Sequence, residues 1–361
     1  MRTNGQRAGF SLVELLIVIL IIALIVAILL PALAGARNAS KRTDTESLCA
    51  QISSAIGQFQ IDNRRLPGQF SVREMASQEN QDTRGMSMAE NVMLELGGVK
   101  RSTTAPVPAT GWVANVGPNG TGTIWVKPGE TEGKAYFTPS AKYYAALDAQ
   151  SQEGSTAGQN LPDLVDGFGN PLLLWIEDEA SVGKPELISS TGPETRVAFV
   201  RSTFEPGANG GPAKFYTATN ACFLKSRALA RGGMDITSTD QEKGSFLGGA
   251  NEGNRLNALA AILGNPNFPT YPNNDPNNAQ ASQIVPGAAR GSFVIQSAGI
   301  DGTYLGRLAK KNRGANTAVG GVLYYGSAIK NSGGTEHVGP DGKPFVYDFA
   351  KEFDDVIVAG N

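Results

Sequence analysis

Phe10-Ser11-Leu12-Val13-Glu14 opens an apolar run that continues to Leu30, and this run decides how the rest of the chain must be arranged. From Phe10 to Leu30 it is 21 residues long. As an α-helix it would span about 31 Å, which matches the roughly 30 Å hydrocarbon core of a bilayer. Its one ionisable side chain is Glu14. Because a buried carboxylate costs about 2.5–3.5 kcal/mol at the bilayer centre and less near an end, we expect Glu14 to have a function.

The residues around the start of this run resemble a known processing signal. Arg7-Ala8-Gly9 precedes Phe10, and Glu14 follows four residues later. The pattern resembles the prepilin signal of type IV pilin-like proteins, which include the pseudopilins of type II secretion. The resemblance implies that residues 1–9 are a leader, that a prepilin peptidase cuts after Gly9, and that the new N-terminus on Phe10 is methylated.

Two other interpretations of the run remain open, namely a secretory signal peptide and a plain membrane anchor. A signal peptide has an apolar core of roughly 7–15 residues followed by a small-residue cleavage site. This run is longer, it carries Glu14 early, and Ala32-Leu33-Ala34 is the only late candidate site. A plain anchor would not need Glu14. The pattern therefore favours the pilin-type signal.

Glu14 would be the fifth residue of the mature chain. Cleavage after Gly9 would place a charged amine on Phe10, one helical turn from the Glu14 carboxylate. Lipid offers neither group a hydrogen-bond partner, so pairing would relieve the cost of burying both. The resemblance implies that Glu14 pairs with the N-terminal amine of a neighbouring subunit during assembly into a homopolymer. Alternatively, Glu14 reaches the lipid headgroups, because it lies about 6 Å from the start of the run.

Helical character continues beyond the apolar run. Pro31 lies where the family often carries a helix-loosening proline, and proline inside a helix loosens or kinks it. Apolar residues then recur at helical spacing on one face. These residues are Leu48, Ile52, Ala55, Ile56 and Phe59. We expect this helix to end near Asn63, before Leu66-Pro67-Gly68.

We therefore expect three parts after the leader. They are a membrane half of the helix at residues 10–30, an amphipathic half at 31–63 and a globular head at 64–361. The 44 glycines and 20 prolines favour a loop-rich, largely β head. Residues 205–290 look like an insertion in that head, with a helical patch near 255–263. The formal net charge of −2 gives no general attraction to nucleic acid.

Recognisable catalytic motifs are lacking. The single histidine is His337, and no nucleophile elbow, P-loop or zinc-ligand spacing accompanies it. We therefore expect no enzymatic activity. A basic cluster could contact nucleic acid, lipid headgroups or a neighbouring subunit, but a solvated face is favoured, and nucleic acid is not an expected partner. This cluster consists of Arg307, Lys310, Lys311 and Arg313.

The segment Asp166-Gly167-Phe168-Gly169-Asn170-Pro171 leads into an apolar run at Leu172–Ile176. Glycine and proline followed by such a run predict a turn into a buried strand. The segment resembles the pseudopilin pattern Asp-x-Trp-Gly-Asn-Pro, with Phe168 in the Trp position. Its place after a pilin-type helix strengthens the resemblance, although any turn into a buried strand could carry similar residues.

Two C-terminal segments resemble the end of the major pseudopilin of type II secretion. Ser297-Ala298-Gly299-Ile300-Asp301-Gly302 matches its Ser-x-Gly-x-Asp-Gly loop, and Asp354-Asp355-Val356 matches the acidic start of its last strand. In that family the loop often holds calcium, which prefers six to eight oxygen ligands. The resemblance implies Asp301 and Asp355 as ligands, with Asp354 as a substitute. However, about 50 residues separate the two segments here, far more than usual. A plain hairpin turn and a solvated strand end are the alternatives.

The two cysteines are Cys49 and Cys222. A location outside the cytoplasm would permit a disulfide between them. Cys49, however, lies beside the apolar face of the helix, where a lone cysteine behaves as a small hydrophobic residue. The residues favour a free Cys49, with pairing to Cys222 as the alternative.

Together these features predict an α+β protein with a pilin-like fold, in which a long N-terminal helix packs on a small antiparallel sheet with loop-rich insertions. The resemblance implies a single-pass inner-membrane precursor with a periplasmic head, whose further partners are membrane lipid and an inner-membrane assembly platform. We expect a structural subunit of a type II secretion-like pseudopilus. The alternatives are a true type IV pilin for adhesion, motility or DNA uptake, and a membrane-anchored binding module that uses a pilin-type signal.

Overall fold

A computed structural model gives the arrangement of the chain. It describes residues 12–68, 70, 87–102, 112–116, 122–145, 161, 163–177, 186–188, 196–198, 216–217, 245–246, 252–270, 284–286, 288–306, 323, 325, 348, 350 and 353–360. Several sites that the sequence singles out lie outside this set. They are Gly9, Phe10, Cys222, the basic cluster at 307–313 and His337.

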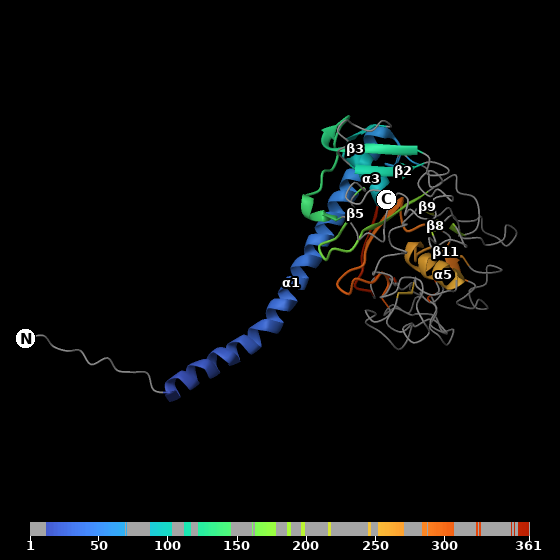
Figure 1. Ribbon diagram of the computed structural model, residues 1–361. Coiled ribbons are helices and arrows are strands. Elements are labelled where there is room, and N and C mark those ends of the chain that lie inside the picture. Colours follow the sequence, from blue (N-terminus) through green and yellow to red (C-terminus); the bar gives the residue numbers. More distant parts are fainter. Residues whose placement is uncertain are drawn as a thin grey trace, which may run out of the picture.

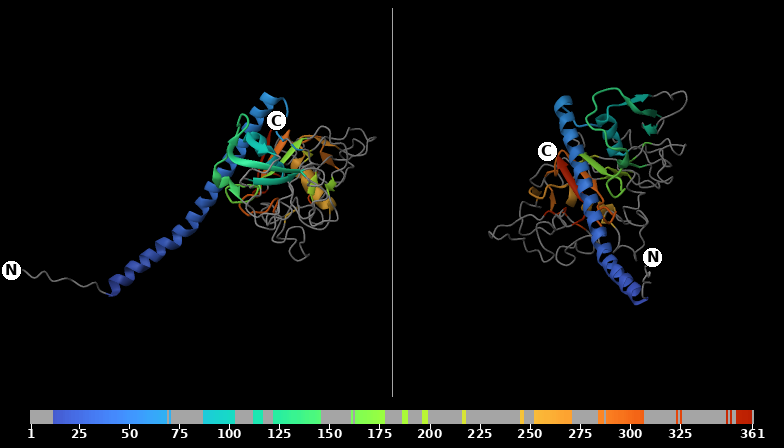
Figure 2. Two further views of the ribbon diagram at one scale, coloured as in Figure 1. Left: turned by 45° about the horizontal axis from the view of Figure 1, so that its top comes forward. Right: turned by 90° about the vertical axis from the view of Figure 1, so that its left-hand side faces the viewer.

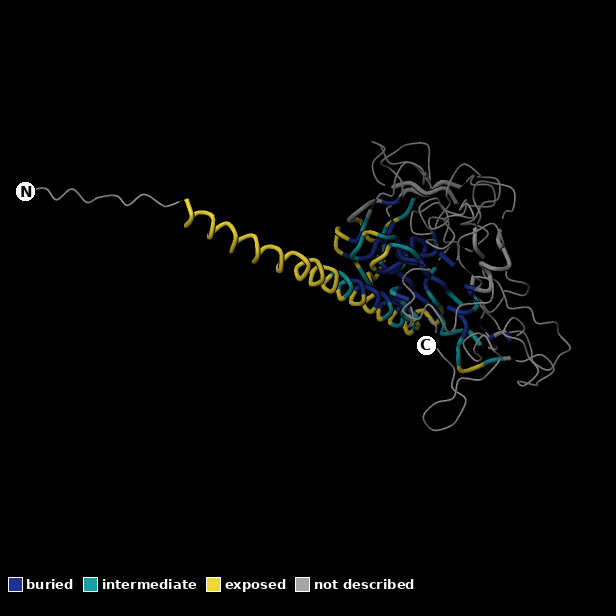
Figure 3. Tube along the Cα trace, turned by 90° about the horizontal axis from the view of Figure 1, so that it is seen from below, coloured by how far each residue is buried: buried dark blue, intermediate teal, exposed yellow. Residues whose placement is uncertain are grey.

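The longest element is helix α1, Leu12–Asn63, which runs through Pro31 without a break. At 52 residues it is about 78 Å long. Its first half extends away from the head and is exposed on all sides, whereas its second half is buried along one face (Figures 1 and 3). Within the described chain, α1 is the one helix long and apolar enough to cross a membrane. The apolar half of α1 is therefore the candidate membrane-spanning segment of the described residues.

The second half of α1 packs on the head through a regular stripe. The buried side chains are Thr45, Leu48, Cys49, Ile52, Ala55, Ile56 and Phe59, which recur every three or four residues. They contact the sheet strands β12, Phe293–Ser297, and β13, Val356–Gly360, and the helix α3, Met88–Leu96. The free thiol of Cys49 is fully buried in this stripe, where burial raises its pKa to about 12.

The principal sheet has four antiparallel strands in the order β13-β12-β6-β9. Strand β6 is Leu173–Glu177 and β9 is Tyr216–Thr217. Strand β12 is central and buried along its length, with Ile295 opposite Leu174 of β6 and Val358 of β13. Turning the molecule shows α1 passing across β12 and β13 (Figure 2). The helix and this sheet therefore form the two layers of the core.

Smaller sheets surround this core. The strands β1, Val99–Ser102, β2, Trp112–Val116, and β3, Gly122–Thr131, form an antiparallel sheet in the order β1-β3-β2. Three antiparallel pairs join β4 to β5, β7 to β8 and β10 to β11. The first pair is β4, Tyr144–Ala145, with β5, Asp163–Leu164. The second is β7, Glu186–Ile188, with β8, Arg196–Ala198. The third is β10, Pro269–Thr270, with β11, Val285–Pro286. The mixed α+β class predicted from the sequence is confirmed.

Helix α3 has an identifiable local cause, whereas the short helix η1 leads directly into a strand. Helix α3 begins with a capping box, in which the Ser87 hydroxyl accepts from the Glu90 N–H and the Glu90 carboxylate accepts from the Ser87 N–H. Residues 141–143 form the 3₁₀ helix η1, Ala141–Tyr143, after which Tyr144 and Ala145 pair with β5 as a strand.

The predicted insertion is attached to the sheet through helix α5, Glu252–Leu263. The Arg290 side chain donates to the carbonyl of Ile262 at 2.5 Å and makes a bidentate ion pair with Asp348 at 2.8 and 2.9 Å. A guanidinium at the C-terminus of a helix also stabilises the helix dipole. Arg290 therefore holds the end of α5 against the start of β12.

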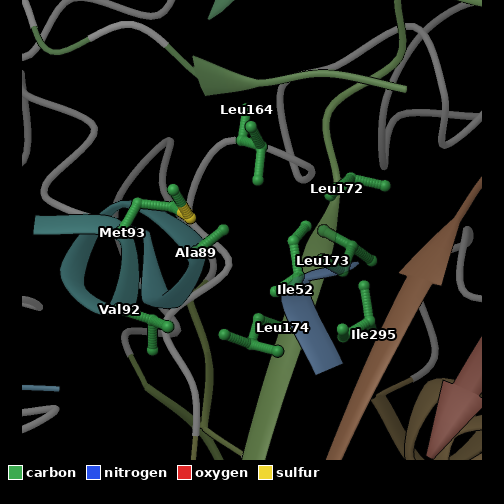
Figure 4. Close-up of a pocket in the computed structure, with 9 residues that line it drawn as sticks. All are labelled: Ile52, Ala89, Val92, Met93, Leu164, Leu172, Leu173, Leu174 and Ile295. Carbon is green, nitrogen blue, oxygen red and sulfur yellow. The ribbon is translucent and has the colours of Figure 1, made fainter. Parts of the chain in front are cut away.

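The centre of the core is closely packed. Side chains from α1, α3, β5, β6 and β12 enclose a void of about 10 Å³ (Figure 4). Its lining is entirely hydrophobic, so it offers a water molecule no hydrogen-bond partner. Ile52 of α1 projects into this centre and is 3% exposed.

We predict that Ile52→Ala lowers the free energy of unfolding by about 2–5 kcal/mol, because it removes buried methyl groups and leaves a cavity. Ile61→Ala is the matched control, since Ile61 lies on the same helix but is 79% exposed. Its expected effect is within about 0.5 kcal/mol. Guanidinium unfolding of the full chain in detergent micelles measures both. Equal effects would contradict the described packing.

Candidate functional site

The assembly residues predicted from the sequence lie at the free end of α1. Glu14 occupies the first turn of the helix, and Pro31 lies within it, both on exposed positions. Large apolar side chains around Glu14 are also exposed, from Leu12 to Leu33. The apolar side chains of this segment are therefore exposed, where lipid or other chains can contact them.

A tight turn at residues 165–171, here called the helix-contact turn, joins α1 to the sheet. The N–H of Gly167 donates to the hydroxyl of Thr45 on α1 at 3.0 Å. A Cβ atom at Gly167 would lie 2.7 Å from the carbonyl oxygen of Lys41, so only glycine permits this approach. The Lys41 ammonium group lies 5.4 Å from the centre of the Phe168 ring. The turn thus rests directly on the backbone of the helix.

Asp166 stabilises this turn from inside. One of its carboxylate oxygens accepts from the N–H groups of Phe168 and Asn170, at 2.8 and 2.9 Å. The other accepts from the hydroxyl of Ser297, at the end of β12, at 2.6 Å. Burial raises the pKa of Asp166, whereas these hydrogen bonds favour its ionised form. The helix-contact turn therefore links α1 to the central strand.

A second turn, at residues 299–306, follows β12 and is here called the acidic turn. Gly299 and Gly302 have φ values of 69° and 68°, and Leu305 has a φ of 49°, which is unfavourable for a residue with a side chain. The Asp355 carboxylate accepts from the Leu305 N–H at 3.0 Å and holds it in this conformation. The hydroxyl of Tyr304 donates to the carbonyl of Pro171. The acidic turn is thereby attached to the helix-contact turn.

The three acidic residues predicted as metal ligands have different surroundings. Asp354 accepts from the N–H of Asp301 at 2.9 Å through one oxygen, and its other oxygen is buried without a hydrogen-bond partner. Asp355 points into the core, where Gln296 and Leu305 both donate to it. Asp301 is exposed as a residue, but its carboxylate lies against Gly306 and accepts from the Thr303 N–H at 2.7 Å, so the carboxylate itself is partly buried. The structure therefore places Asp354, the substitute in the sequence analysis, beside Asp301, whereas the oxygens of Asp355 are taken by protein donors.

These carboxylates interact unfavourably when ionised. Burial, and then the neighbouring Asp354 carboxylate, raise the pKa of Asp301 to about 6. Burial also raises the pKa of Asp355 well above its ordinary value. A cation placed between Asp301 and Asp354 would reverse this repulsion. Within the described ranges, no group of three or more His, Cys, Asp or Glu side chains is arranged to hold a metal ion, so backbone carbonyls and water would supply the remaining oxygens.

Sequence reasoning missed two features of this region. The Thr45 contact joins residues 122 positions apart, and Thr45 looks like an ordinary polar residue beside the apolar stripe. The hydrogen bond from Ser297 to Asp166 spans 131 positions. Neither contact has a local signal, although a glycine directly after Asp166 indicates a close approach of backbone to another element.

Comparison with known proteins supports the N-terminal assignment. Residues 4–30 match the model of the prokaryotic N-terminal methylation motif. The chain therefore carries a type IV pilin-like prepilin signal, of the kind that directs prepilin peptidase processing and subunit assembly. No curated protein and no solved structure matches the chain.

We predict that Asp301 makes folding stability depend on pH. Its pKa is about 6 in the folded chain and about 4 when unfolded, so the folded state binds more protons between these values. Stability should therefore fall as pH rises from about 4 to 6. Asp301→Asn removes this loss. In the presence of a chelator its Tm, relative to that of the unmodified chain, should rise across this window.

The control for this measurement is Asp62→Asn. A hydrogen bond from Lys134 lowers the pKa of Asp62, so ionised Asp62 contributes stability above its unfolded pKa. The Tm of Asp62→Asn relative to the unmodified chain should therefore fall as pH rises toward the unfolded pKa of about 4, and should stay nearly level above it. Thermal unfolding of the three chains from pH 4 to pH 7 compares these trends. Parallel curves for Asp301→Asn and the unmodified chain would show that Asp301 titrates normally.

Proposed function

We propose that this chain is the precursor of a structural subunit of a type II secretion-like pseudopilus. The observation that supports it most directly is the methylation motif at 4–30, which overlaps the exposed apolar half of α1, a helix that continues into the head. In this proposal the prepilin peptidase cuts after Gly9, and Phe10 is N-methylated. The mature chain then polymerises from the inner membrane, with its head in the periplasm.

The exposed half of α1 supplies a physical route to polymerisation. Its apolar side chains are solvated by lipid while the chain is in the membrane, and water would not solvate them. A subunit can leave the bilayer only if the helices of other subunits replace the lipid. In the filament, Glu14 pairs with the methylated amine of a neighbouring Phe10, which offsets the cost of burying either charge alone.

The pseudopilin assignment, in preference to a true pilin, is supported by the head. The helix-contact turn and the acidic turn carry the two sequence patterns that resemble pseudopilins. The first turn is bonded to β12 through Ser297 and to the second turn through Tyr304. The work of extension would come from a separate motor that acts through an inner-membrane assembly platform.

We further propose that the acidic turn binds calcium through Asp301 and Asp354. The buried Asp354 oxygen without a partner and the repulsion between the two carboxylates support a cation at this position. Hard carboxylate and carbonyl oxygens suit calcium. Bound calcium would neutralise the two charges, and Asp355 would continue to hold Leu305 from inside the core.

We predict that Glu14→Ala leaves membrane insertion and cleavage intact but prevents incorporation into filaments. Without the carboxylate, the amine of a neighbouring subunit is buried unpaired. Glu46→Ala is the control, because Glu46 is an exposed acid on the same helix that pairs only locally with Arg42. Filaments sheared from cells that express each variant should contain Glu46→Ala and lack Glu14→Ala.

The same preparations test processing. N-terminal sequencing and intact mass should give a chain that begins at methylated Phe10. A chain that begins at Met1, or at an alanine beyond the apolar run, would refute the proposed function. Deletion of the gene should abolish secretion of exoproteins. Loss of motility or DNA uptake with normal secretion would identify a true pilin, and a cleaved chain that never polymerises would identify a binding module.

We predict that calcium raises the Tm of the full chain in detergent micelles. At a free concentration of 100 times Kd the stabilisation is about 2.7 kcal/mol. Asp301→Asn and Asp354→Asn should lose this increase, whereas Asp62→Asn, remote from the turn, should keep it. An unchanged Tm for the unmodified chain with calcium would exclude the cation site and leave the filament proposal untouched.

A further inference from the structure

The predicted insertion at 205–290 contacts the acidic turn through two of its described residues, Ser245 and Phe246. The hydroxyl of Ser245 donates to the carbonyl of Tyr304, and the N–H of Phe246 donates to the carbonyl of Leu305 at 3.0 Å. Ser245 also forms an isolated β-bridge with Gly306. The insertion thus adds a short strand-like segment along the second half of the acidic turn.

Phe246 also contacts the segment that carries Asp354. The ring of Phe246 packs edge-on against the ring of Phe353, with their centres 5.9 Å apart and their planes at 85°. Both rings are buried. Phe353 immediately precedes Asp354 in the chain. The Phe246 ring is therefore packed against the segment that carries Asp354, and the Phe246 backbone is bonded to the turn that carries Asp301.

The position of this contact bears directly on Asp301. A Cβ atom at Gly306 would collide with the Asp301 carboxylate, so the Gly306 backbone lies against that group. Ser245 is the bridge partner of Gly306. A shift of the Ser245–Phe246 segment would therefore move the Gly306 backbone, which confines the Asp301 carboxylate. It would also move the Phe246 ring, which packs on Phe353 next to Asp354.

We propose that Ser245 and Phe246 are positioning residues for the cation site, and that calcium binding and docking of the insertion stabilise each other. This inference rests on the calcium proposal made above. The two acids belong to segments far apart in the sequence, and Ser245-Phe246 contacts both. Its docking fixes the Gly306 backbone beside Asp301 and the Phe353 ring beside Asp354, and a bound cation in turn fixes the surface on which it docks.

Linkage requires this coupling to be reciprocal. If docking strengthens calcium binding, calcium must strengthen docking by the same factor. The amide of Phe246 reports on docking, since it donates to Leu305 only when the segment is in place. Calcium should therefore slow hydrogen exchange at this amide.

The test measures calcium affinity by titration calorimetry on the full chain in detergent micelles, after removal of bound metal with a chelator. Phe246→Leu should weaken binding about tenfold, within the 5–150-fold range of ordinary coupling between sites. Phe268→Leu is the matched control, because Phe268 lies in the same insertion but is exposed. Ser245→Ala, which removes one hydrogen bond, serves as a milder second variant and should weaken binding in the same direction.

The outcomes separate the two proposals. Weaker binding in Phe246→Leu and Ser245→Ala, normal binding in Phe268→Leu, and calcium-dependent protection of the Phe246 amide would establish the coupling. Unchanged affinity in folded Ser245→Ala and Phe246→Leu would overturn it while leaving the calcium site in place. Absence of calcium binding by the unmodified chain would overturn both, but would not affect the filament proposal.

Discussion

The burial of one face of α1 is the constraint on which the rest of the structure depends. The first half of α1 is apolar all round and therefore suits lipid. The second half is apolar on one side and packs on the folded head. The strands β12 and β13 and the helix α3 meet on the buried face. The head is therefore organised around a helix that also leaves it, and any force on one half is transmitted to the other.

The helix-contact turn converts this packing into a defined orientation. Hydrophobic contacts alone would allow the sheet to slide along the stripe, whereas the Gly167–Thr45 hydrogen bond sets a single register. The hydrogen bond from Ser297 to Asp166 fixes the position of β12 relative to this turn. The hydrogen bond from Tyr304 to Pro171 fixes the position of the acidic turn. The two turns whose sequences resemble pseudopilins are thus hydrogen-bonded to each other.

Features with a local period could be predicted from the sequence. The spacing of Leu48, Ile52 and Phe59 predicted the buried face of α1, and the apolar run at 172–176 predicted β6. The choice between Asp354 and Asp355 could not be predicted, because adjacent residues at the start of a strand face opposite ways and only tertiary contacts decide which faces inward. The contacts of Ser245 and Phe246 with the acidic turn join residues about 60 positions apart, and the sequence does not predict them either.

The placement of β13 has a consequence for how the molecule is made. Residues 356–360 lie against a helix that ends at residue 63, and every other described element is synthesised between them. The ribosome therefore delivers the hydrophobic face of α1 long before the strand that closes over it. Until that strand has been made, the face needs a temporary cover, because its native contacts join residues far apart in the sequence and form late.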